Sequence, residues 1–90
     1  MPPLPPATFE YLALSLRLQA EMQLGLYTGK EEGSVPPDLK GARQTIDLLG
    51  VLQEKTRGNL SLEEQRLLDN SLTELRFRYV QAAEKVNKKP

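Results

Sequence analysis

The sequence predicts an all-α protein of three helices, in which a C-terminal antiparallel helical hairpin packs with a two-faced N-terminal helix in an oligomer. Leucine-rich stretches repeat their apolar residues at helical spacing, and strong stop and start signals separate the last two stretches. Aromatic residues make up only 6% of the chain and tryptophan is absent, which favours packed helices over a β-sandwich. We expect one helical domain at residues 9–86, between a proline-rich arm at residues 1–8 and a frayed tail at residues 87–90.

The proline-rich arm contains Pro2, Pro3, Pro5 and Pro6, which favour an extended backbone with few hydrogen-bond donors. One interpretation is a ligand for a proline-recognising domain. We favour the simpler one, a short arm that precedes the first helix.

The first helix is predicted at residues 9–26, with Thr8 as its N-cap. Its leucines alternate as in a strand, but the stretch contains no β-branched residue and is longer than typical strands. Wound at about 100° per residue, its apolar positions separate into two stripes. One stripe consists of Phe9, Leu12, Ala13, Leu16, Ala20 and Leu24, and the other of Tyr11, Leu14, Leu18 and Met22.

A helix with two apolar stripes needs two neighbours. Burial of a large apolar side chain stabilises a protein by roughly 1.5–3 kcal/mol. If the second stripe stayed exposed to solvent, about 6–10 kcal/mol of hydrophobic stabilisation would be lost. The cover is either the rest of the same chain or a second copy of the protein, and we favour the second copy, since so short a chain buries a limited share of its surface. The predicted oligomer interface consists of Tyr11, Leu14, Leu18, Met22, Gly50 and Val51.

Residues 27–36 form a polar, glycine-containing connection, long enough for the first helix to pack on its own hairpin or on that of a partner. Pro37 and Asp38 mark the start of a second helix at residues 37–56. Val51 lies outside the apolar face of this helix, and Gly50 beside it indicates a close helix approach on the second side. That face comprises Leu39, Ala42, Ile46, Leu49 and Leu52, with Leu48 at its margin.

A tight reversal follows the second helix. Gly58 offers the left-handed conformation that commonly ends a helix, and Lys55 suits the negative helix C-terminus. Ser61 and Glu64 have the spacing of a capping box, which starts a third helix at residues 62–86. With so few residues between them, the two helices are predicted to form an antiparallel hairpin. The third helix presents a heptad seam of Leu68, Leu72, Leu75, Tyr79, Ala82 and Val86, flanked by Leu67 and Phe77.

Several strings in this hairpin resemble a known family. They are TIDLL at residues 45–49, LQEKT at 52–56, GNL at 58–60 and LRFRYV at 75–80. Together they are similar to the small bacterial proteins called domain of unknown function eighteen-forty-four, from about Thr8 to Ala82. The resemblance implies a bacterial, cytoplasmic protein, and the family name implies no activity.

Little in the sequence indicates catalysis. The chain has neither cysteine nor histidine, so the usual thiolate nucleophile, imidazole base and zinc ligands are missing. No carboxylate spacing resembles a calcium loop. Gly29 and Lys30 precede Glu31 and Glu32, whose charge would repel a phosphate. We therefore expect that the protein is not an enzyme and that it has neither a cofactor nor a metal site.

Charge and hydropathy narrow the possible partners. The formal net charge is zero, which disfavours nucleic acid or an anionic membrane surface as the main partner. No segment reaches about 18 uninterrupted apolar residues, and we expect a soluble, cytoplasmic protein without a membrane span. The first helix mixes Glu10, Arg17 and Glu21, whereas membrane-surface helices present a basic face.

The function we expect is a self-associating protein-interaction or scaffolding module, whose protein partner the sequence does not identify. The alternative is a small nucleic-acid-binding regulator, because arginines alternate with aromatic residues in the third helix. We rank it second because Tyr79 belongs to the core seam and Glu74 and Glu84 share the exposed surface. Its basic face would consist of Arg76, Arg78, Lys85, Lys88 and Lys89.

Overall fold

The computed structural model of the chain describes residues 6–26 and 37–87. Within these ranges it contains no strand and three α-helices, α1 at Phe9–Gln23, α2 at Leu39–Lys55 and α3 at Leu62–Asn87. The predicted all-α class is therefore confirmed. The expectations about residues 1–5, about the connection at 27–36 and about the tail at 88–90, which includes Lys88 and Lys89, lie outside the described residues.

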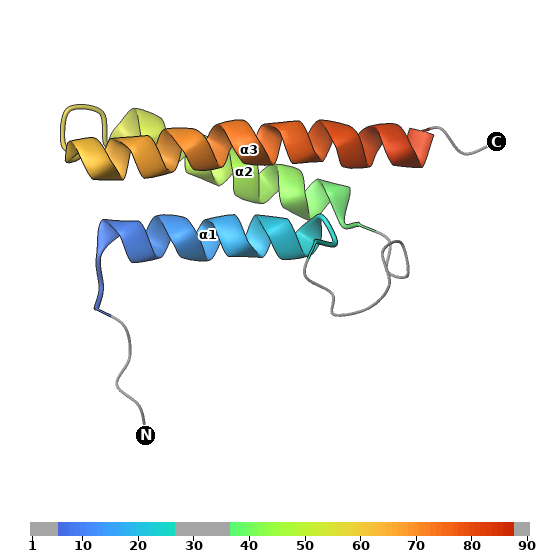
Figure 1. Cartoon of the computed structure of the whole chain (residues 1–90), viewed down its shortest axis with the longest axis horizontal. Helices are drawn as coiled ribbons and strands as arrows, with labels where there is room; N and C mark the ends of the chain where they lie inside the picture. Colours follow the sequence, from blue (N-terminus) through green and yellow to red (C-terminus); the bar gives the residue numbers. More distant parts are fainter. Residues whose placement is uncertain (1–5, 27–36, 88–90) are drawn as a thin grey trace, which may run out of the picture.

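The three helices pack side by side, and each contacts the other two (Figure 1). The direction of the chain reverses between α1 and α2 and again between α2 and α3 (Figure 1). α3 is the longest of the three, and its C-terminal end extends beyond α1 (Figure 1). The shared core therefore lies in the space that the three helices enclose.

Short polar side chains begin the first two helices. The Thr8 hydroxyl accepts a hydrogen bond from the backbone N–H of Tyr11 at 3.0 Å, which confirms Thr8 as the N-cap of α1. The Asp38 carboxylate accepts one from the N–H of Gly41 at 3.0 Å. Asp38 is thus the N-cap of α2, and the helix begins slightly later than predicted because this residue precedes its first turn.

α1 ends at Gln23, three residues earlier than predicted. Gly25 adopts a φ of 84°, and the N–H of Leu26 donates to the carbonyl of Glu21 at 3.0 Å. The N–H of Gly25 donates to the carbonyl of Met22, also at 3.0 Å. These contacts form the glycine-dependent Schellman end of a helix, so Gly25 stops α1 although the leucine pattern continues past it.

The turn between α2 and α3 follows the predicted signals. Gly58 has a φ of 84°, the left-handed conformation expected of a residue just past a helix end. At the start of α3, the Ser61 hydroxyl accepts from the N–H of Glu64 at 3.1 Å, and the Glu64 carboxylate accepts from the N–H of Ser61 at 2.8 Å. The predicted capping box is confirmed.

The core is formed by the predicted faces of α2 and α3 and by part of α1. Val86, expected in the seam of α3, is instead 41% exposed, since α3 has few neighbours where it extends beyond α1 (Figure 1). The buried cluster consists of Ala20, Leu24, Ala42, Ile46, Leu49, Leu68, Leu72 and Leu75.

The α1 region turns both large and small side chains toward this core. Leu24, just past the helix, belongs to the buried cluster, and Phe9 and Leu16 pack against it. Ala13 and Ala20 are fully buried, whereas Leu12, expected on the same face, is 44% exposed. Because Leu12 lies about 100° around the helix from Ala13, only a narrow arc of α1 fits against the other two helices. The predicted inner stripe was therefore too wide by this residue.

No helix in the described parts of the chain combines the length and the apolar character needed to cross a membrane.

Candidate functional site

The candidate site is the side of α1 that faces away from the core, formed by Tyr11, Leu14, Leu18 and Met22, and called here the outer face of α1. These side chains are 48%, 47%, 49% and 56% exposed. The described residues of the same chain therefore leave the predicted second stripe about half uncovered. The sequence left two ways to bury this stripe, against the same chain or against a second copy. The described part of the same chain does not bury it.

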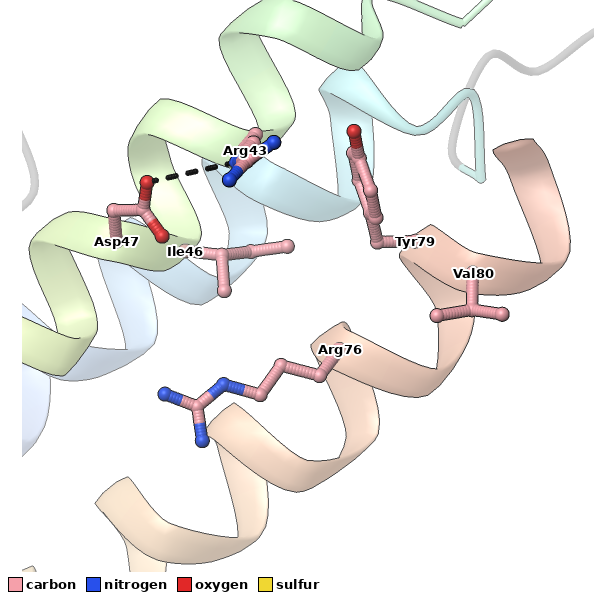
Figure 2. Close-up of a pocket in the computed structure, with 6 residues that line it drawn as sticks. All are labelled: Arg43, Ile46, Asp47, Arg76, Tyr79 and Val80. Atoms are coloured by element: carbon pink, nitrogen blue, oxygen red, sulfur yellow. Dashed lines mark ion pairs between the residues drawn. The ribbon is translucent and has the colours of Figure 1, made fainter.

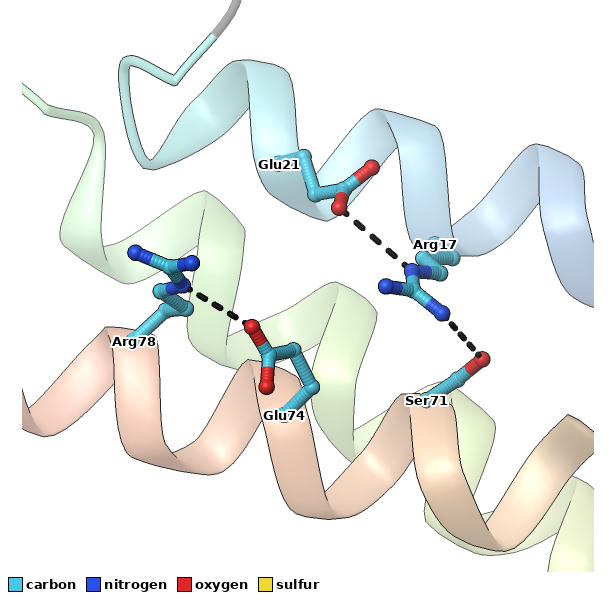
Figure 3. Close-up of polar contacts among 5 residues, drawn as sticks. All are labelled: Arg17, Glu21, Ser71, Glu74 and Arg78. Atoms are coloured by element: carbon cyan, nitrogen blue, oxygen red, sulfur yellow. Dashed lines mark hydrogen bonds and ion pairs between the residues drawn. The ribbon is translucent and has the colours of Figure 1, made fainter.

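The rotation of α1 is held on the α3 side by a polar contact. The Arg17 guanidinium donates to the hydroxyl of the fully buried Ser71 at 3.4 Å and pairs with Glu21 at 3.4 Å (Figure 3). Displacing the guanidinium would leave the buried Ser71 hydroxyl without this partner, away from bulk water. Arg17 and Glu21 are thus engaged with each other and with α3.

A second polar contact holds α1 on the α2 side. The hydroxyl of the buried Thr45 donates to the Gln23 side-chain carbonyl at 2.6 Å and accepts from the Gln19 side-chain amide at 3.3 Å. With polar contacts on both flanks and alanines between them, α1 has one favourable rotation. That rotation directs the outer face away from the other helices.

The outer face is almost free of charge. Among the exposed residues of α1, Glu10 is the only charged one, because Arg17 and Glu21 are partly buried. The nearby Ser15 hydroxyl already donates to the backbone carbonyl of Tyr11 at 2.8 Å. Its donor would therefore keep a hydrogen-bond partner if the surface were buried. Leu12 on α1 and Leu26 in the turn that follows it are both 44% exposed and add to the apolar surface of this region. The free-energy cost of removing water from this surface is therefore low.

Gly50 and Val51, the α2 members of the predicted interface, lie elsewhere. Val51 is 48% exposed. A Cβ on Gly50 would meet only the guanidinium of Arg76, at 3.6 Å, among the described residues. A close helix approach occurs instead at Gly41, where a Cβ would lie 2.8 Å from the side-chain amide of Gln23 and would overlap the Asp38 carboxylate. The signal for this contact was present as a second glycine in the predicted helix.

The predicted basic residues of α3 do not gather on one face. Arg76 lines a pocket between α2 and α3 (Figure 2), whereas Arg78 pairs with Glu74 at 3.1 Å on the side of α3 that bears Ser71 (Figure 3). Residues two apart in a helix point about 200° apart, so these two arginines leave α3 in different directions. Lys85 is already engaged in an interaction.

Acidic side chains are equally dispersed. Within residues 6–26 and 37–87, no three histidines, cysteines or carboxylates approach one another closely enough to hold a metal ion.

The fold and the surface together define a small all-α protein with one strongly apolar exposed helix. The model of a family described as domain of unknown function (DUF1844) matches residues 6–81, and the chain belongs to that family. The match confirms the resemblance seen in the strings of the second and third helices. No curated protein and no solved structure matches the chain.

Proposed function

We propose that the chain is a self-associating protein-interaction or scaffolding module, in which a second copy covers the outer face of α1. The observation that carries the proposal is the half exposure of Tyr11, Leu14, Leu18 and Met22 on a helix whose alanines are buried. A helix selected only to close a monomeric core would carry polar side chains on the side that faces away from the core.

The energy of such an interface can be bounded. Burying the exposed half of four large apolar side chains would stabilise by about 3–6 kcal/mol per copy, and by about 6–12 kcal/mol for two copies. Association costs about 4–15 kcal/mol in lost translational and rotational freedom. The outer face alone therefore comes near break-even, and the proposed interface extends to the flanking Leu12 and Leu26.

The lack of charge supports a second copy as the partner. A two-fold interface places the same surface against itself, so a charge close to the axis meets its own copy. The outer face avoids this repulsion, because Glu10 is the only exposed charge on α1. A membrane surface would instead favour a basic polar face beside the apolar one.

In this proposal α2 and α3 act as an antiparallel hairpin that supports α1. The Gln53 side-chain amide donates to the Asp69 carboxylate at 2.7 Å and links the two helices. The hairpin would leave the surface opposite α1 open for other proteins, as a scaffold requires. The bacterial cytoplasm, which the resemblance implies, is the proposed setting.

Sedimentation velocity of the full chain tests the proposal. Between about 1 μM and about 300 μM, which corresponds to association free energies of about −8 to −5 kcal/mol, the weight-average mass should rise from that of one chain toward that of two or more. A folded protein that stays monomeric across this range would contradict self-association.

A further inference from the structure

The pocket between α2 and α3 combines two arginines with an apolar floor and lies apart from the outer face of α1. It has a volume of about 200 Å³. Figure 2 shows Arg43 on α2 and Arg76 on α3, with Ile46 between their guanidinium groups and Tyr79 beside Arg43. Asp47 and Val80 complete the lining.

The guanidinium of Arg76 is available to a ligand. Within the described residues it makes no ion pair and no hydrogen bond, although Arg17 and Arg78 both have partners. It lies over Gly50, where an added Cβ would be in ordinary van der Waals contact, 3.6 Å from the Arg76 Nη2 atom. Arg76 thus presents an unused, always charged fork of donors over the backbone of α2.

Arg43 is only weakly engaged. Its Nε atom lies 3.9 Å from the Asp47 carboxylate, and the two side chains are 72% and 68% exposed. Exposed pairs at this distance contribute little, and an i,i+4 pair of this kind exchanges readily with another carboxylate. A ligand carboxylate at Arg43 would therefore displace little, and a second carboxylate would gain the unused donors of Arg76.

The floor of the pocket selects for an apolar group beside the carboxylate. Ile46 is buried, Tyr79 is half-buried and packs against the core, and Val80 is 53% exposed. A side chain laid over Val80 would remove its exposed half from water. The recognised group therefore has two parts, one anionic and one apolar.

We propose that this pocket binds an acidic peptide segment, in which one glutamate or aspartate contacts Arg76, a second contacts Arg43, and a neighbouring apolar side chain covers Val80. The volume lies below the range of about 300–1,000 Å³ that suits whole small molecules, and it is enough for part of a peptide. A nucleic-acid strand fits less well, because Arg78 lies on another side of α3 and cannot extend a row of phosphate contacts from Arg76.

Chemical-shift mapping of the isotope-labelled full chain tests this inference. The probes are capped hexapeptides that alternate glutamate with leucine, valine, phenylalanine or tyrosine, with matched peptides in which glutamine replaces glutamate. At low salt, at least one glutamate peptide should shift the amides of residues 43–50 and 76–80, and its glutamine counterpart should not. Absence of shifts with all glutamate peptides up to about 5 mM, near the weak limit of specific binding, would overturn the proposal.

Two arginine variants make the test specific. Arg76→Gln should weaken peptide binding about fivefold or more, because a charge-assisted contact is lost. Arg78→Gln, on the same helix and similarly exposed, should leave it within about twofold. Equal losses in the two variants would indicate non-specific charge attraction and overturn the site.

The remaining occupants are separate outcomes of the same experiment. A single-stranded oligonucleotide that shifts the pocket amides more strongly than any peptide would replace the peptide proposal with nucleic acid. Pocket amides that shift on dilution of the protein alone would show that a second copy occupies the pocket, and this too would overturn it. Neither result depends on whether the outer face of α1 associates.

Discussion

The outer face of α1 and the core beneath it use the same residue type in opposite surroundings. Leu49 and Leu72 are 0% and 1% exposed, whereas Leu14 and Leu18 are 47% and 49% exposed. The core leucines already contribute their hydrophobic free energy to the monomer, and those of the outer face retain about half of theirs for another contact. The difference shows that leucine content by itself does not tell which residues hold the monomer together.

The largest effect should come from a charge placed in the core. Leu49→Glu should cost about 4 kcal/mol or more, since no partner for a carboxylate lies in this apolar cluster, and that is most of the stability of a small domain. We expect loss of the helical circular dichroism signal at 25 °C. A folded Leu49→Glu protein would mean that the cluster is not a real core.

The matched change on the outer face should leave the fold intact and break the assembly. Leu18→Glu would place a like-charged pair in or near a two-fold interface, and about 3 kcal/mol of lost association corresponds to about a hundredfold higher Kd. The helical signal should stay close to that of the parent protein, while sedimentation velocity shows monomers. If Leu18→Glu and Leu49→Glu behaved alike, the distinction between the two regions would fail.

The alanines of α1 offer a test from the inner side. Ala20→Leu adds volume to a fully buried position, and overpacking of this kind costs about 1–3 kcal/mol. Urea unfolding should show the loss as a lower midpoint with an unchanged slope. Ser15→Leu, at an exposed position of the same helix, is the control and should not lower the midpoint.

The smallest expected effect concerns the start of α3. Ser61→Ala removes the acceptor of the Glu64 N–H and should destabilise by about 1 kcal/mol, without changing self-association. Thermal unfolding measures the loss. Ser61→Asp should keep the cap, because a carboxylate also accepts this hydrogen bond, so an equal loss in both variants would argue against the capping box.

Local features of this fold could be predicted from the sequence because their causes lie within one helical turn. The capping box of Ser61 and Glu64, the cap at Thr8 and the left-handed Gly58 all depend on neighbouring residues. Gly25 could likewise have predicted the end of α1, but the leucine pattern beyond it suggested a longer helix. The separation of Arg76 from Arg78 likewise follows from helix geometry alone.

The candidate site was partly predictable for the same reason. The periodicity of α1 placed Tyr11, Leu14, Leu18 and Met22 on one stripe, and the structure keeps them together as exposed side chains. The pocket was not predictable, because Arg43 and Arg76 belong to different helices and meet only when α2 and α3 pack. No spacing within either helix signals that meeting.

By itself, the sequence determined three helices, most of their boundaries and two apolar stripes on the first of them, since backbone hydrogen bonding and side-chain periodicity are local properties. Only the tertiary structure decided which stripe of α1 is buried. The contacts of Thr45 with Gln19 and Gln23, and of Arg17 with Ser71, connect residues far apart in the chain and set the rotation of α1. The close approach at Gly41 and the solvent exposure of Leu12 follow from that packing, because both depend on how near the other helices come.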